Sequence, residues 1–316
     1  MPTTAFPVNP ELTAIAIGYK NRDIDLVADQ VLPRVATAKK FVYTKYTTAD
    51  GYTVPATRVG RKSEPNKVDF GGTLVNDECV DWGLDSLVPN DEIKAFDEMP
   101  KPNSLVSPLS KTVSMLTGLV LLDREIRVAT LLTTLATYQA SLRATLSGTS
   151  QWSDFTNSNP LDAILTALDT PIVRPNTFFL GQAVWTKLRQ HPRMIQAANA
   201  SAQTGGAITR QQLADLIEVP TIVVGAGFYN TAARGQTPSY TRIWGKHAGL
   251  LFVSEDQANA DQPTFGFTAQ FGDRVAGDLP APEVGLRGGV KVRSGESVKE
   301  VIASNDCGYF FQNAVA

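Results

Sequence analysis

The strongest pattern of hydrophobic and polar positions lies in Pro108–Leu146. Apolar residues return there every three or four positions, as they do on one face of an α-helix. Ser107, just before the proline, suits an N-cap, and Gly148 suits a stop beyond the last periodic residue. The pattern predicts one long helix over this range, or two helices on one axis, with Leu132 and Leu135 in its core.

Three other structures compete with a long helix. A membrane span needs ~20 apolar residues, but the apolar run Met115–Leu122 is about half that length and is followed by the charged Asp123. A coiled coil needs a strict heptad with charged flanks, and the Ala- and Thr-rich second half and Gly118 argue against one. A core helix broken near Gly118 stays open. Asp123 and Arg127 lie one turn apart and are expected to form an exposed ion pair.

The first 80 residues contain too little apolar patterning to form a core of their own. Residues 1–38 carry four prolines around one short amphipathic stretch, Ile24 to Leu32, which indicates an arm that lies on another surface. From Lys39 to Val80, segments rich in β-branched and aromatic residues are separated by glycine and proline. This stretch predicts a long β-hairpin.

Charge is distributed unevenly along this part of the chain. The stretch from Lys39 to Lys67 is basic, whereas Asn76 to Ser104 is acidic. Both runs can be solvated faces. Alternatively, the basic hairpin of one copy lies over the acidic segment of its neighbour. The candidate interface residues are Arg58, Arg61, Lys62 and Lys67 on the basic side, and Asp77, Glu78, Asp81 and Asp85 on the acidic side.

The remainder mixes helices and strands without a regular βαβ alternation, which predicts an α+β fold. The whole chain of 316 residues is 43% hydrophobic and 19% charged, enough for a sizeable core. Lysine and arginine total 29 against 31 acids, so the formal net charge of −2 gives no general attraction to nucleic acid or to an anionic membrane. The start lacks a secretory signal pattern, so a cytoplasmic product is expected. Cys79 and Cys307 are expected to be reduced structural thiols.

No motif in the chain predicts catalysis. Gly225 and Gly227 follow a predicted strand, but Asn230 replaces the third small residue of a dinucleotide fingerprint, which favours a tight turn. His191 and His247 have no metal or nucleophile partner in sequence, and His191 is expected at a helix end, near the last carbonyls. There is no P-loop, zinc spacing or nucleophile elbow. We expect no catalytic, cofactor-binding or metal-binding residues, and no cofactor.

The order of these parts resembles the Hong Kong phage-type shell fold, shared by tailed-bacteriophage major capsid proteins and encapsulins. RVGRKSEPNKVDF resembles the tip of the extended loop in one phage coat family, LTGLVLLDREIRVATLL its spine helix, and ATLSGTSQWSDFTNSNP the stretch that follows. RPNTFFLGQAVWTKLRQHPRMI and ITRQQLADLIEVPTIVVGAG resemble the axial lobe, and DCGYFFQNAV resembles the closing strand of the peripheral lobe.

The resemblance implies a division of the chain into an arm, an extended loop, a peripheral domain and an axial domain. The arm is 1–38 and the loop is 39–80. The peripheral domain is 81–174, with the spine helix at 108–146, and it is closed by strands in 291–316. The axial domain is 175–290, with part of the peripheral β return.

The resemblance also implies a structural role. Many copies would form hexamers and pentamers of an icosahedral shell, assembled in the host bacterial cytoplasm, that encloses double-stranded DNA without sequence-specific binding. A separate scaffolding protein and a portal are the expected partners, and no membrane is involved. Some shells of this fold carry a Lys–Asn cross-link, but no asparagine and glutamate stand out as partners for Lys62 or Lys67, so we expect none. An encapsulin-type compartment and an unrecognised α+β enzyme are the alternatives.

Overall fold

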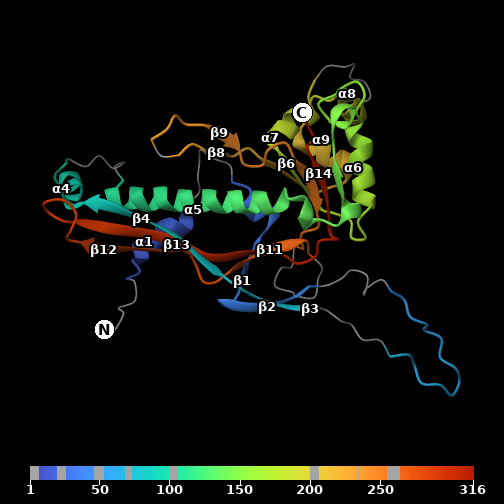
Figure 1. Cartoon of the computed structure of the whole chain (residues 1–316), viewed down its shortest axis with the longest axis horizontal. Helices are drawn as coiled ribbons and strands as arrows, with labels where there is room; N and C mark the ends of the chain where they lie inside the picture. The colour runs from blue at the N-terminus through green and yellow to red at the C-terminus, as the bar shows by residue number, and fades with distance from the viewer. Residues whose placement is uncertain are drawn as a thin grey trace.

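The computed structural model describes residues 7–19, 26–45, 53–67, 73–99, 106–199, 206–233, 235–254 and 264–316. Helices and strands are mixed without a regular alternation, which confirms the α+β class. Figure 1 shows an elongated body in which one long helix follows a long sheet, with a lobe of helices and strands at one end.

The long helix, α5 (Pro108–Leu132), is the predicted spine, but it ends at Leu132 rather than at Leu146. Ser107 is at the N-cap position, although its side chain makes no capping hydrogen bond. At the other end, Thr133 and Thr134 donate their hydroxyls to backbone carbonyls one turn earlier. The apolar periodicity beyond this point belongs to other elements.

After α5 the chain turns away from the helix axis to bury Tyr138. The Tyr138 hydroxyl donates to the Leu132 carbonyl over 2.9 Å, and its ring stacks against Phe265 and Phe310, with centroids 5.1 Å away in each case. Leu135 is half-buried in this turn, outside the helix, so its predicted place in the spine is wrong. The short elements here are η1 (Leu135–Thr137), η2 (Ala140–Leu142), β5 (Arg143–Thr145) and η3 (Gly148–Ser150).

Gly118 does not break α5, because the helix is continuous across it. A Cβ at this position would lie 3.1 Å from the Tyr19 hydroxyl, so glycine allows the residue after helix α1 (Pro10–Gly18) to approach the spine closely. The arm therefore crosses α5 at its smallest residue.

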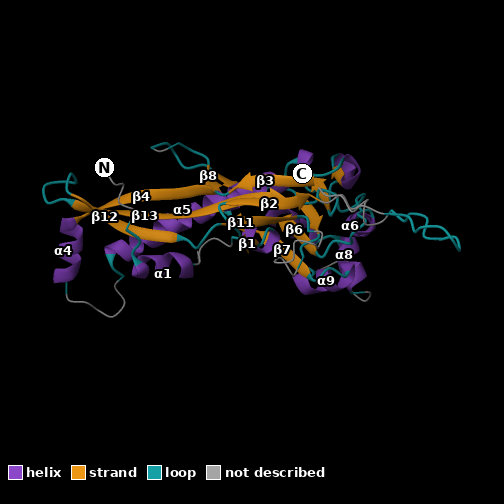
Figure 2. Ribbon diagram, turned by 90° about the horizontal axis from the view of Figure 1, so that it is seen from below, coloured by secondary structure: helices purple, strands orange, loops and turns teal. Residues whose placement is uncertain are grey.

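The long sheet has the strand order β1-β11-β13-β12, with β4 on the other edge of β13. Its strands are β1 (Arg34–Ala36), β4 (Val80–Pro89), β11 (Gly266–Gln270), β12 (Val275–Ala281) and β13 (Gly289–Ile302). Helices α5 and α1 pack on one face, where Leu12, Val113, Leu116 and Val292 share a buried cluster. Figure 2 shows the length of this sheet.

The lobe is built on a second sheet with the order β5-β14-β10-β6-β7. Its other strands are β6 (Thr177–Gly181), β7 (Thr221–Gly225), β10 (Ala248–Leu251) and β14 (Gly308–Gln312), and its helices are α6 (Pro160–Asp169), α7 (Gln182–Leu188), α8 (Pro192–Ala198) and α9 (Arg210–Ile217). The expectation that the last strand closes the peripheral lobe is wrong. Successive side chains of β14 face opposite ways, so Phe310 packs beside α5 while Phe311 packs among the lobe helices.

The remaining elements are short. They are α2 (Ala28–Val31), β2 (Lys40–Lys45), β3 (Thr73–Glu78), α4 (Asn90–Glu98), β8 (Phe228–Asn230) and β9 (Tyr240–Arg242). Strands β2 and β3 pair antiparallel and form the base of the predicted hairpin. Of the predicted amphipathic stretch at the end of the arm, Ile24 and Asp25 lie outside the described residues, and the rest contains α2.

Glu125 joins three separate parts of the chain inside the protein. It lies on α5 and is 1% exposed. Its Oε1 accepts from the backbone N–H of Val27 (3.0 Å) and from Trp244 Nε1 (2.7 Å), and its Oε2 accepts from the Ala28 N–H (2.8 Å). Burial raises the pKa of this carboxyl, whereas the three donors oppose the shift. Spine, arm and lobe are therefore held by one side chain.

Its neighbour Arg124 is also buried and faces the arm. Arg124 Nη1 lies 2.7 Å from an Asp29 carboxylate oxygen, and Nη2 donates to Thr268 Oγ1 over 3.0 Å. Asp29 also accepts from Arg34, which reaches the buried Glu296 at 2.8 Å. Burial alone would raise the pKa of Glu296, but the nearby guanidinium groups hold it below its usual value. Alternating charges thus link arm, spine and β13.

Replacing Leu132 by aspartate is expected to lower the free energy of unfolding by at least ~3 kcal/mol, because a charge would enter a fully buried site. Leu119→Asp is the matched control, since Leu119 lies on the same helix but is 53% exposed. Thermal unfolding followed by circular dichroism measures both variants. Equal losses in the two would contradict the assigned core face of α5.

Replacing Glu125 by glutamine is expected to cost about 1–3 kcal/mol, because the amide NH2 would face a backbone or indole donor and leave it unsatisfied. Glu98→Gln, on the exposed side of α4, is the control for loss of one negative charge. Urea denaturation of the isolated subunits compares the two variants. A stability of Glu125→Gln equal to that of the control would rule out the joining role of Glu125.

Candidate functional site

The most prominent surface feature is a loop, residues 53–67, that projects from the body beyond β2 and β3 (Figure 1). The structure places no strand in it, so the long β-hairpin predicted from Lys39 to Val80 is wrong for residues 53–67, and β2 and β3 are its paired part. The Asn66 side-chain amide donates to the Ala56 carbonyl over 2.7 Å, and the Ser63 N–H donates to the Gly60 carbonyl over 3.0 Å. The loop is extended and turns at its tip.

All four basic candidates lie on this loop and are exposed: Arg58, Arg61, Lys62 and Lys67. Among the described residues, none of them forms an ion pair, and Glu64 is the one acid between them. Val59 is 47% exposed and lies among these charges. The structure therefore presents a basic tip with an apolar side chain at its turn.

The four acidic candidates lie on β3 and β4, where each meets a basic residue of its own chain. Asp77 lies 3.6 Å from Lys299 Nζ, Glu78 lies 4.0 Å from Lys40 Nζ, and Asp81 lies 3.2 Å from Lys39 Nζ. Asp85 binds Arg293 through two contacts of 2.6 and 2.7 Å. Exposed pairs of this kind contribute little to stability.

Hydrogen bonds to the charged forms explain the lowered pKa of two of these carboxyls. Ser297 and Lys39 lower the pKa of Asp81, and Arg293 lowers that of Asp85. Both groups are ionised at neutral pH. The segment thus alternates in sign instead of forming an uninterrupted acidic face, and its contact with a neighbouring copy stays a prediction.

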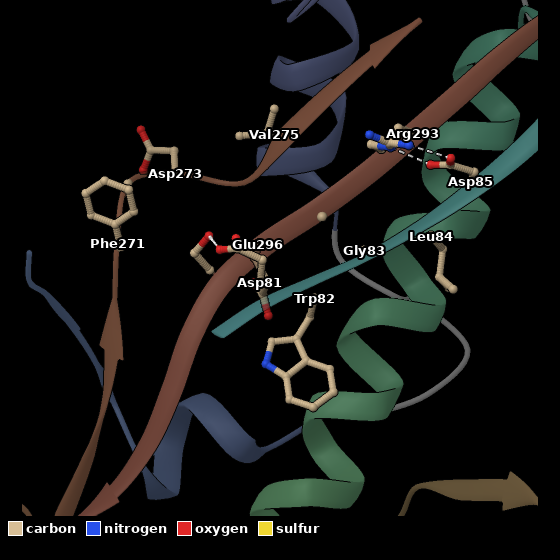
Figure 3. Close-up of a pocket in the computed structure, with 13 residues that line it drawn as sticks. Asp81, Trp82, Gly83, Leu84, Asp85, Phe271, Asp273, Val275, Arg293 and Glu296 are labelled. Atoms are coloured by element: carbon tan, nitrogen blue, oxygen red, sulfur yellow. Dashed lines mark hydrogen bonds and ion pairs between the residues drawn. The ribbon is translucent and has the colours of Figure 1, made fainter. Parts of the chain in front are cut away.

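A hollow of about 720 Å³ lies on the long sheet beside these carboxylates (Figure 3). Gly83 of β4 pairs directly with Gly295 of β13, which in turn pairs with Val275 of β12. A Cβ on Gly295 would lie 2.6 Å from the Trp82 carbonyl oxygen, so the close approach of β4 and β13 requires glycine there. The paired glycines leave the floor of the hollow without side chains.

The walls of the hollow combine apolar and charged groups. Phe271 and Val275 stand at one end, and both are exposed. The Arg293–Asp85 pair lies on one side of the glycines, and Asp81, which accepts from Ser297 Oγ at 2.5 Å, lies on the other. No pattern in the sequence pointed to this site, because β4 lies far from β12 and β13 in the chain.

The two histidines are structural. His191 is buried, its Nδ1 accepts from the Arg193 N–H over 3.3 Å, and its Nε2 lies 3.1 Å from Ser158 Oγ. It therefore caps the start of α8, whereas the sequence indicated a contact with the end of the preceding helix. His247 Nδ1 accepts from the Asn313 N–H over 3.2 Å. Burial lowers the pKa of both imidazoles.

Gly225 ends β7, residues 226–227 link it to β8, and packing requires glycine at position 225. A Cβ on Gly225 would lie 2.1 Å from the Trp244 ring, and strand β8 follows instead of a helix. Within the described ranges, no group of three His, Cys, Asp or Glu residues is placed to hold a metal ion. No helix in the same ranges is long and apolar enough to cross a membrane.

No protein-family model matches the chain. Over 317 aligned residues it is 45% identical to the major capsid protein of Pseudomonas phage JBD67, and the match covers 100% of both chains. The crystal structure of a phage-related protein from Bordetella bronchiseptica RB50 superposes with a TM-score of 0.74 at 21% identity, covering 98% of each chain.

A virus-like particle protein from Pyrococcus furiosus shares the fold at a TM-score of 0.52 and 11% identity, covering 95% of this chain and 96% of its own. The fold is thus the phage-type shell fold expected from the sequence. Identity of 45% along the whole length goes further than fold, and the chain belongs to the family of phage major capsid proteins.

Proposed function

We propose that this chain is the shell subunit of a virion and assembles into hexamers and pentamers of an icosahedral capsid around double-stranded DNA. The observation that carries this proposal is the projecting loop. Residues 53–67 are in no strand, and the side chains of Val54 and Val59 are 83% and 47% exposed. A segment of this kind is stable in place when a neighbouring copy covers it.

The phage shell is favoured over an encapsulin-type compartment because the relative at 45% identity is a phage major capsid protein. The role is structural and not enzymatic. Assembly takes place in the cytoplasm of the bacterial host, with a separate scaffolding protein and a portal as partners. A formal net charge of −2 suits a wall that encloses DNA without binding it tightly.

The basic tip of one copy meets the acidic segment of the next in this proposal. Closed rings of identical subunits need contacts between two different surfaces of each subunit. The loop and strands β3 and β4 supply two such surfaces. Their opposite charges act over distance and guide the encounter before short-range packing takes over.

Purified protein is expected to form closed particles tens of nanometres across, as measured by light scattering and electron microscopy. Co-expression with the scaffolding protein of the same phage serves as a second condition, since shells of this family often need one. A stable monomer or dimer under both conditions would contradict the proposed function.

Changing Arg61 and Lys62 to glutamate is expected to leave the subunit folded but to raise the dissociation constant of each contact at least about tenfold, or about 1.4 kcal/mol, and so to reduce assembly. Assembly of the unchanged protein should also weaken as salt shortens the screening length from ~8 Å at 0.15 M to ~3 Å at 1 M. Lys111→Glu, an exposed site on α5, is the matched control. Normal assembly of the double variant at all salt concentrations would exclude the charge-guided contact.

A further inference from the structure

The hollow over Gly83 and Gly295 has the shape and charge of a receptor. We propose that it receives Val59, at the loop tip of a second copy of this chain, with the basic residues around Val59 facing the carboxylates at its rim. This inference rests on the proposed function, since it assigns the site on the acidic segment that the loop occupies.

The register of three strands defines the hollow. On the sheet face away from α5, Val275, Gly295 and Gly83 lie in one row across β12, β13 and β4. In the next row, Arg293 pairs with Asp85. The row on the other side holds Ser297 and Asp81, and the Phe271 N–H donates to the Ser297 carbonyl over 2.9 Å. A side chain entering between these rows meets bare backbone below and side chains around it.

The hollow is open to a partner. Phe271 and Val275 are 45% and 39% exposed, although both belong to the wall of a concave site. A volume of about 720 Å³ corresponds to roughly two dozen waters. This space suits an aliphatic side chain together with part of the turn that carries it.

The charges of the two surfaces are complementary. The rim carries the carboxylates of Asp81, Asp85 and Asp273, of which Asp85 is paired with Arg293 and Asp81 with Lys39. Asp273 is exposed and has no ion pair within the described ranges. The loop supplies an excess of three positive charges, because four basic residues are opposed by Glu64 alone. Val59 lies between Arg58 and Arg61 in the loop, and the hollow lies between Asp81 and Asp85 on β4.

The occupant must come from another copy. In Figure 1 the loop leaves the body beyond β2 and β3 and its tip points away from the long sheet, whereas the hollow lies on β4, β12 and β13. Helix α4 is also acidic, and its residues are partly or fully exposed. The hollow therefore matches both the apolar side chain and the positive charge of the tip.

A disulfide tests the contact directly. Val59→Cys combined with Val275→Cys is expected to give, after mild oxidation of assembled particles, a ladder of cross-linked chains on a non-reducing gel. Disulfides form only when the two Cβ atoms lie about 3.5–4.5 Å apart, so the ladder reports direct contact. The native thiols do not interfere, because Cys79 and Cys307 are buried and burial raises the pKa of Cys307 to about 11.

Val54→Cys with Val275→Cys is the matched control, because Val54 lies on the same loop but away from the tip. It should give no ladder. Particles that form normally while Val59→Cys/Val275→Cys stays monomeric on the gel would overturn the hollow as the receptor and leave the proposed shell function intact. Absence of particles from the unchanged protein would instead count against the shell function itself.

A charge swap provides an independent test. Asp273→Lys is expected to reduce assembly at least about fivefold, and adding Lys62→Glu should restore it at least partly, because the attraction returns with reversed sign. Measurement is by sedimentation of particles against free subunits. Loss of assembly in Asp273→Lys without recovery in the double variant, or no loss at all, would overturn the assignment.

Discussion

A buried carboxyl group is stable only when hydrogen-bond partners surround it, and Glu125 takes its three donors from two segments far away in sequence. Arg124, the preceding residue, is equally dependent on Asp29 and Thr268. Removing one partner from such a site leaves an uncompensated charge, which costs several kcal/mol. The spine helix therefore cannot settle into its final environment until the arm and the lobe are both in place. This requirement makes the body of the subunit a single cooperative unit.

The apolar pattern predicted the spine helix but placed its end at Leu146, whereas α5 ends at Leu132. Apolar residues continue with helical spacing beyond Leu132, and nothing local distinguishes Leu142 and Leu146 from the residues of α5. The end is decided by Tyr138, whose ring belongs between Phe265 and Phe310. Its neighbours come from residues more than a hundred positions away, so no local pattern could reveal the turn.

The charged residues after the apolar run have a second role. Asp123 argues against a membrane span, and the two charged residues that follow it, Arg124 and Glu125, are buried. An arginine and a glutamate side by side in an apolar helix are a signal of buried polar contacts that sequence reading can use. The exposed loop was predicted in position but not in conformation. Its alternating residues suggest strands, yet a strand needs a paired strand beside it, and residues 53–59 are in no strand pair with the described part of the chain.

The position of strand β14 determines when, during synthesis, the subunit can complete its fold. It lies between β5 and β10, so the sheet of the lobe lacks an inner strand until the residues after position 307 are synthesised. A nascent chain that has already produced the loop and the spine still exposes two open strand edges in the lobe. Contacts this distant in sequence form slowly. Folding of the lobe is thus delayed until β14 has been synthesised, and chains that stop before β14 are excluded from the pool of subunits that can join a shell.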